Sequence, residues 1–181
     1  MPFENQAIKI NSHHNNVVQI KVIPGHFATN HSHITHYIDM TTLKTRQTMA
    51  RSAAKSIASE YVGTTVVDTI ICMDGTEVIG GFLAEELTNS GIVSMNQHQA
   101  MYVVTPEFNS VGQMIFRDNL QPMIRGKHVL FLLASATTGR TIERSLECVS
   151  YYGGIVAGIN LKADIAGDKV GRNDVDRYIA Y

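Results

Sequence analysis

The feature that most constrains the fold is the segment 129–149, VLFLLASATTGRTIERSLECV. An apolar run over 128–133 predicts a buried strand, which leads through a loop of small residues into a helical pattern over 140–150. A further apolar run, 154–161, returns after the helix. This order predicts two parallel strands joined by a right-handed helical crossover.

Strands and helices alternate along the rest of the chain as well. Helical spacing of apolar residues predicts helices over 42–61 and from about 77 to 87, and the His-rich segment 24–40 is predicted to be a loop. The other predicted strands are 17–23, 65–72, 101–104 and 176–181. Because the central runs are apolar throughout, we expect an open, mainly parallel α/β sheet with helices on both faces.

The length and composition indicate one globular domain over residues 1–181. Fifteen Lys and Arg residues nearly balance sixteen Asp and Glu, so the overall charge gives no attraction to nucleic acid or anionic lipid. No apolar run reaches the roughly 20 residues that span a bilayer, and the N-terminal sequence lacks the features of a secretory signal. With Cys72 and Cys148 interpreted as free thiols, we expect a cytoplasmic protein without nucleic-acid or membrane partners.

The loop between the strand at 128–133 and the following helix is a candidate anion site. The first N–H groups of a helix lack partners within the helix, and the helix dipole favours an anion there. Threonine hydroxyls add donors, and Arg140 offers a cation. From these residues alone, a simple helix cap with an exposed Arg140 is equally open. The candidate phosphate-binding residues are Ser135, Ala136, Thr137, Thr138, Gly139, Arg140 and Thr141.

With its flanking strands, this loop resembles the phosphoribosyl-diphosphate (PRPP) signature of type I phosphoribosyltransferases. In that signature an apolar strand, two acidic residues and a Thr-Thr-Gly-x-Thr loop occur in order. The upstream chain is similar to the orotate phosphoribosyltransferases. Residues 26–39 resemble the N-terminal hood, 67–87 resemble the strand, pyrophosphate loop and helix, and 101–113 fall where the family has its mobile catalytic loop.

The resemblance covers about residues 20 to 165, and it implies a small N-terminal hood over about 1–40 and an α/β core over about 41–181. It also implies a homodimer. The order of the weakly patterned segment 105–126 is left open. Ligands of open α/β sheets bind beyond the carboxyl ends of the strands, so the loops that follow the central strands are expected to share one edge.

The sequence departs from the family pattern at the charged positions. The paired acids before the phosphate loop fall on Leu133 and Ala134, the hood lysine falls on Asn30, and the pyrophosphate-loop lysine falls on Thr76. The basic and His positions of the mobile loop fall on neutral residues, and only a glycine matches. These mobile-loop positions are Thr105, Pro106, Asn109, Val111 and Gly112.

The candidate pyrophosphate loop has gained two acids instead. It consists of Asp74, Gly75, Thr76 and Glu77. As turn residues, Asp74 and Glu77 need no function, and they would repel a bare pyrophosphate. If the enzyme is active, they would recruit Mg²⁺. No other cofactor is expected, and no catalytic residue can be assigned.

These matches and losses favour a protein that keeps the 5'-phosphate site, binds a nucleoside monophosphate or PRPP, and has weak or no transferase activity. The alternative is an active phosphoribosyltransferase of pyrimidine or other nucleotide metabolism. Such an enzyme would act on orotate or another base with a site rebuilt from Asp74, Glu77 and Arg140. A third possibility is a structural domain whose loop binds nothing.

The His-rich segment is the other candidate for chemistry. His31, His33 and His36, with His26 nearby, have the composition of a metal site. Apart from Asp39, no carboxylate or cysteine with ligand spacing accompanies them, so we expect no metal and interpret the segment as solvated or base-stacking.

Overall fold

The core of the computed structural model is a four-stranded parallel sheet with the strand order β5-β4-β8-β9. The strands are β4 (Thr69–Cys72), β5 (Tyr102–Val104), β8 (His128–Leu133) and β9 (Ile155–Leu161). The structure describes residues 8–11, 19–28, 33–89, 91, 94–97, 99–134 and 140–161. The predicted strand at 176–181 and the loop residues 135–139 lie outside this part of the chain.

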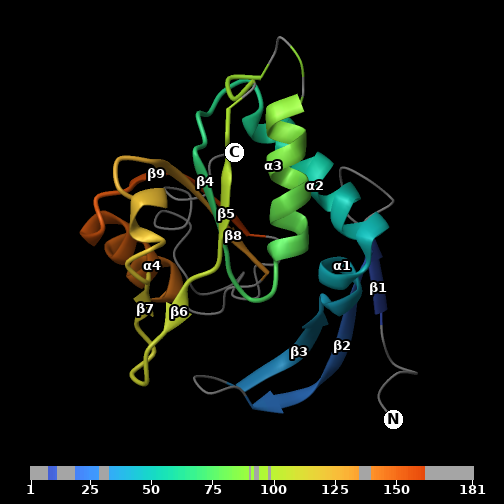
Figure 1. Cartoon of the computed structure of the whole chain (residues 1–181). Coiled ribbons are helices and arrows are strands. Elements are labelled where there is room, and N and C mark those ends of the chain that lie inside the picture. The colour runs from blue at the N-terminus through green and yellow to red at the C-terminus, as the bar shows by residue number, and fades with distance from the viewer. Residues whose placement is uncertain are drawn as a thin grey trace.

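Helices cover both faces of the sheet, as the sequence predicts (Figure 1). On one face lie α1 (Thr41–Thr45), α2 (Gln47–Tyr61) and α3 (Glu77–Asn89), and on the other lies α4 (Arg140–Tyr151). Successive side chains of a strand point to opposite faces. Ile70 therefore packs with α2 and α3, whereas Ile71 packs in the cluster that α4 covers. The expected open α/β sheet is confirmed.

At their amino ends, β4 and β8 are joined by a polar contact. One carboxylate oxygen of Asp68 accepts hydrogen bonds from the backbone N–H of His128 at 2.7 Å and from its ring Nδ1 at 3.0 Å. Partial burial alone would raise the pKa of Asp68, but the two hydrogen bonds from His128 outweigh it and hold the pKa below its usual value.

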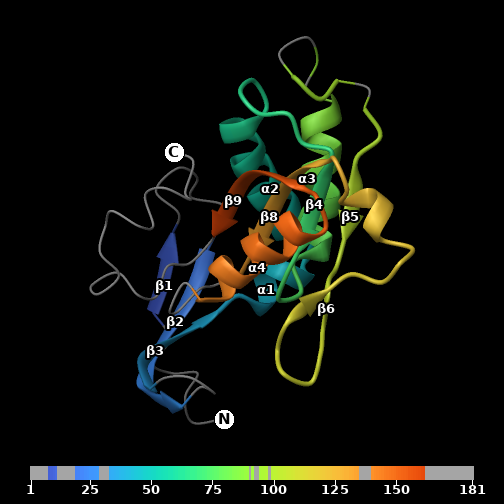
Figure 2. The same cartoon turned by 90° about the vertical axis from the view of Figure 1, so that its left-hand side faces the viewer.

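The N-terminal segments form a separate antiparallel sheet with the order β1-β2-β3, beside the end of the core that carries α1 (Figures 1 and 2). Its strands are β1 (Ile8–Asn11), β2 (Gln19–Ala28) and β3 (His33–Asp39). The prediction of a loop over 24–40 is therefore wrong. Cross-strand pairing continues past Pro24, and the register shift between Pro24 and Phe27 accommodates a residue that has no N–H to donate.

Two other predicted elements have different bounds. The predicted helix over 42–61 is divided at Arg46, whose backbone is extended (φ −85°, ψ 115°). The strand predicted over 65–72 begins only at Thr69. The predicted buried face of the helix is confirmed, and its residues are Ala50, Ala53, Ala54, Ile57, Ala58 and Tyr61.

The segment 105–126 contains regular structure. It forms a small hairpin of β6 (Glu107–Phe108) and β7 (Met114–Ile115), followed by the short 3-10 helix η3 (Gln121–Met123). Asn109 organises the hairpin turn, because its side-chain oxygen accepts the backbone N–H groups of Val111 at 3.1 Å and Gln113 at 2.9 Å.

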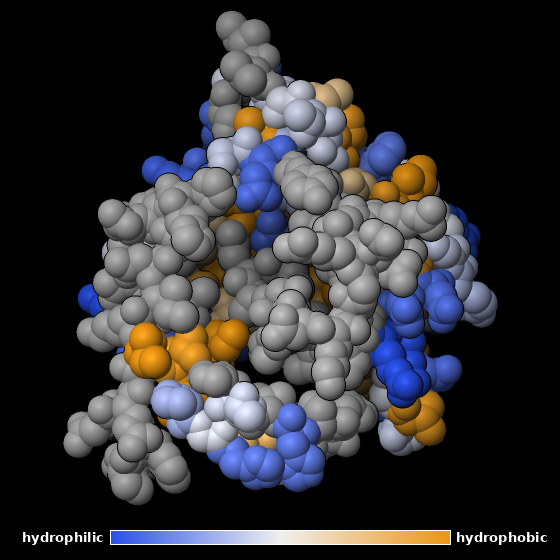
Figure 3. All heavy atoms as spheres, turned by 180° about the vertical axis from the view of Figure 1, so that it is seen from behind, coloured by the Kyte–Doolittle hydropathy of each residue, from blue (hydrophilic) through white to orange (hydrophobic). Residues whose placement is uncertain are grey.

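On the back of the molecule, hydrophilic residues surround small hydrophobic patches over the part that the structure describes (Figure 3). None of the described helices is both long and apolar enough to cross a membrane.

Two adjacent glycines of α3 give a matched test of how the helix packs on the sheet. A Cβ at Gly80 would lie 2.3 Å from the buried Cys72 Sγ and 3.2 Å from Val103 Cγ1, whereas a Cβ at Gly81 would have no atom within 4 Å. We expect Gly80→Ala to lower the free energy of unfolding by about 1–3 kcal/mol through overpacking. Gly81→Ala should raise it by about 0.5–1 kcal/mol through helix propensity. Urea unfolding of both variants measures the difference, and equal effects would contradict this packing.

Candidate functional site

The candidate site lies at the carboxyl edge of the parallel sheet, where β4, β5 and β8 end together. Residues 73–77 follow β4, the β6–β7 hairpin follows β5, and Ala134 follows β8. Both α1 and the start of the hairpin lie at this end of the molecule (Figure 1). The structure therefore brings together the candidate pyrophosphate loop and the start of the mobile-loop segment, as the sequence predicts.

The turn after β4 is tightly built into the sheet. Asp74 and Gly75 both have positive φ, 57° and 77°. Thr76 is buried, and its hydroxyl lies within donating distance of the backbone oxygens of Met73 at 2.8 Å and Leu132 at 3.0 Å. The residue at the family's lysine position thus contacts the backbone of the sheet.

Lys44 of α1 covers this turn, and the sequence analysis did not identify it. Its ammonium donates a hydrogen bond to the backbone oxygen of Asp74 at 2.6 Å. It also attracts the Asp39 carboxylate, whose pKa is lowered mainly by the backbone N–H of Thr41, at 2.9 Å. Lys44 and Asp74 are 30 positions apart in the sequence, and local sequence patterns do not reveal a contact between such distant residues.

The carboxylates of the turn are only partly balanced by this cation. Desolvation raises the pKa of Asp74, Glu77 raises it further, and Lys44 opposes both effects. Glu77, at the first position of α3, accepts a long 3.4 Å hydrogen bond from the Thr105 hydroxyl, which links the ends of β4 and β5. Asp74 and Glu77 have the hard oxygen ligands that Mg²⁺ prefers. Within the described chain, no three His, Cys, Asp or Glu side chains are grouped to hold a metal ion.

The end of β8 carries apolar side chains where the family has its acid pair. Leu133 is 1% exposed and packs in the cluster beneath α4, whereas Ala134 is 4% exposed and packs in the cluster beneath α2 and α3. A carboxylate in either environment would lose its hydration without gaining a partner. These two positions therefore stabilise the core.

The start of α4 lies at the same edge. The helix begins at Arg140, in agreement with the prediction, and both Arg140 and Thr141 are exposed. Ser145 donates to the backbone oxygen of Thr141 at 2.7 Å, and its hydroxyl lies 3.7 Å from the Met73 sulfur, next to the β4 turn. The other five candidate phosphate-loop residues, 135–139, lie outside the described residues.

The histidines of the His-rich segment that the structure describes lie on the β2–β3 hairpin. His26 Nε2 and His33 Nδ1 are 3.0 Å apart, and the two rings stack with their centroids 4.9 Å apart. Both residues are exposed. His31 lies outside the described residues.

Comparison with known proteins identifies the fold. No family model matches the sequence, and no curated protein matches it either. The chain is similar to the adenine phosphoribosyltransferase from Thermoanaerobacter pseudethanolicus ATCC 33223, with a TM-score of 0.55 and 15% identity over 98% of this chain and 94% of that chain. For the orotate phosphoribosyltransferase from Aeropyrum pernix, the TM-score is 0.54 and the identity is 20%, over 87% of this chain and 83% of that chain.

A third similar structure is the orotate phosphoribosyltransferase of Mycobacterium tuberculosis H37Rv in complex with inorganic phosphate. It gives a TM-score of 0.51 and 14% identity over 79% of this chain and 75% of that chain. Together these structures show that the chain has the type I phosphoribosyltransferase fold, which confirms at the level of fold the resemblance seen in the sequence.

Substitution of two threonines at this edge, the buried Thr76 and the exposed Thr105, tests how much the Thr76 hydroxyl contributes to stability. Thr76→Val keeps the shape of the side chain but leaves the buried Met73 carbonyl without the hydroxyl donor, so we expect the free energy of unfolding to fall by about 1–3 kcal/mol. The exposed Thr105→Val is the control and should change it by less than about 0.5 kcal/mol. Chemical denaturation compares the two variants, and a Thr76→Val protein as stable as the wild type would contradict a stabilising role for this hydroxyl.

Proposed function

We propose that this chain, which has the type I phosphoribosyltransferase fold, binds a phosphate monoester and has weak or no transferase activity. The ligand would be a nucleoside monophosphate or PRPP, held by the loop Ser135–Thr141. Inorganic phosphate is bound by one orotate phosphoribosyltransferase of similar fold, which supports phosphate as the recognised group.

The observation that carries this proposal is the burial of Leu133 and Ala134 at the end of β8. In the resembled family these positions hold the ribose hydroxyls and the metal–pyrophosphate through carboxylates. Here they are closed into two apolar clusters on opposite faces of the sheet. A metal-bound diphosphate and a sugar diol would find no acceptor at either position.

Charge at the β4 turn supports the same conclusion. Pyrophosphate departure needs cations, and one charge pair at about 4 Å contributes roughly 4 kcal/mol at an effective dielectric constant near 20. Loss of a single preorganised donor commonly lowers the rate by about 10²–10³. The turn presents Asp74 and Glu77, and the ammonium of Lys44 is engaged by the Asp74 carbonyl.

The start of α4 supports binding of the monoester. Arg140 is exposed at the first position of the helix, and it makes no ion pair with any residue in the described part of the chain. The unpaired N–H groups of a helix start and an adjacent guanidinium favour a phosphate dianion. The start of α4 therefore suits a ligand with a single phosphate group rather than a diphosphate.

Calorimetric titration tests the proposal with orotidylate, other nucleoside monophosphates and PRPP, each with and without Mg²⁺. We expect one monophosphate to bind with a 1:1 stoichiometry that Mg²⁺ does not change. Thr138→Val and Arg140→Gln should each weaken binding about tenfold, through loss of a donor to an anion. Arg125→Gln, which removes an exposed cation before the amino end of β8, is the matched control and should leave affinity unchanged.

Two outcomes would contradict the proposal. If none of the phosphate esters binds, the proposed phosphate site does not exist. Tight PRPP binding that requires Mg²⁺ and is lost in Asp74→Asn would instead support the alternative of an active enzyme with a rebuilt metal site.

A further inference from the structure

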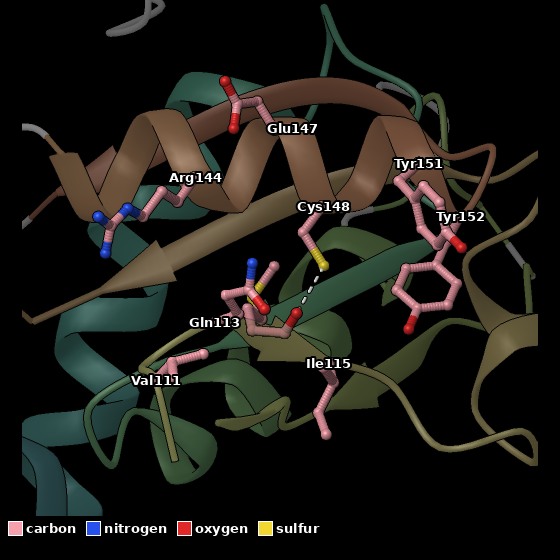
Figure 4. A pocket seen from close by; sticks show the side chains of 9 residues that line it. Val111, Gln113, Ile115, Arg144, Glu147, Cys148, Tyr151 and Tyr152 are labelled. Carbon is pink, nitrogen blue, oxygen red and sulfur yellow. Dashed lines mark hydrogen bonds between the residues drawn. The ribbon is translucent and has the colours of Figure 1, made fainter. Parts of the chain in front are cut away.

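A pocket lies between α4 and the β6–β7 hairpin (Figure 4). Its volume is about 590 Å³, which falls within the roughly 300–1,000 Å³ typical of small-molecule sites. The lining residues are Val111, Gln113, Met114, Ile115, Arg144, Glu147, Cys148, Tyr151 and Tyr152.

Contacts between α4 and the hairpin side hold the walls of this pocket in place. The thiol of Cys148 donates a hydrogen bond to the Met114 backbone oxygen at 3.1 Å and so joins the helix to β7 (Figure 4). At the end of α4, the Tyr152 ring meets Phe116 edge to face with centroids 5.4 Å apart, and Tyr151 meets Tyr152 at 5.2 Å. These contacts join the two walls of the pocket.

The pocket is flanked by large apolar side chains that are exposed to solvent. Val111 is 71% exposed on the hairpin, and Tyr151 is 84% exposed at the end of α4. Exposed apolar groups that gather around a hollow are typical of a binding site, whereas scattered ones need no explanation. Two tyrosine rings beside aliphatic side chains suit a flat aromatic ligand.

One wall of the pocket carries an unpaired positive charge. Arg144 makes no ion pair within the described chain, although Glu147 follows it by three residues on the same helix. Glu147 also belongs to the lining, and Figure 4 shows its carboxylate on the side of α4 that faces away from the hairpin. The Gln113 side-chain oxygen accepts a hydrogen bond from the Asn109 amide, which leaves the amide N–H groups of Gln113 as further donors at this wall.

We propose that this pocket binds a small, flat aromatic acid. The ring would pack on the aliphatic side chains in the middle of the pocket with one edge toward Tyr151 and Tyr152, and the acid group would point along α4 toward the Arg144 guanidinium. Such a ligand would contact α4 and the hairpin at once. Since α4 begins directly after the phosphate loop and the hairpin begins after β5, the ligand would stabilise both elements in their present arrangement.

The probe for this site is 2-naphthoate, and its neutral analogue is 2-naphthalenemethanol. Calorimetry and ligand-observed NMR should detect one saturable naphthoate site, with weaker binding of the alcohol. Arg144→Gln should weaken naphthoate binding about tenfold or more and leave binding of the alcohol unchanged. Arg46→Gln removes an exposed arginine from the helices on the other face of the sheet, and it should leave the binding of both compounds unchanged.

A second variant separates a binding effect from a folding effect. Tyr151→Ala removes an exposed ring, so thermal unfolding should be nearly unchanged while naphthoate binding falls several-fold. Naphthoate affinity that is the same in wild type and Arg144→Gln would overturn the proposal, as would binding that never saturates. If neither compound binds and Tyr151→Ala shifts a self-association equilibrium in sedimentation, the face is a contact between copies and the proposal is wrong.

Discussion

Burial of β4 and β8 on both faces of the sheet is the constraint on which the rest of the structure depends. These strands have helices above and below them, so each of their side chains must be apolar or fully hydrogen-bonded. The same requirement holds at Leu133, the last residue of β8, and at Ala134 after it, which enter opposite clusters. The core of the sheet therefore continues to the edge where an enzyme of this fold would place its charges.

The charges near that edge follow a simple arrangement. Acids gather at the β4 turn, with the single ammonium of Lys44 held against the turn backbone, and an exposed Arg140 stands at the start of α4. An anion approaching the turn meets two carboxylates, whereas one approaching the helix start meets a guanidinium and the positive end of the helix dipole. This asymmetry favours a single phosphate group over a diphosphate. In the proposed function the anion is bound at the start of α4, the helix whose other turns line the pocket beside the hairpin.

The sequence predicted the features that local chemistry determines. The strand at 128–133, the helix starting at 140 and the turn at Asp74-Gly75 were all visible as apolar runs, helical spacing and turn residues. Of the N-terminal sheet, the sequence predicted only the strand at 17–23, because Pro24 and the histidines after it are typical of a loop, whereas the structure continues β2 past Pro24 and pairs it with β3. Lys44 and the pocket beside α4 could not be predicted, because both arise from contacts between segments far apart in the chain. The sequence could suggest that Thr76 replaces a lysine, but not that its hydroxyl turns into the sheet.

The most direct test of the central claim is the release of pyrophosphate by the purified protein with saturating PRPP, Mg²⁺ and orotate, followed continuously by a coupled assay. Adenine and other bases replace orotate in parallel reactions. Since the strand end that would hold the sugar and the metal is closed by Leu133 and Ala134, we expect release at, or only slightly above, the rate of the protein-free reaction with every base. Sustained turnover at an ordinary enzyme rate, about 1 s⁻¹ or faster, would contradict it.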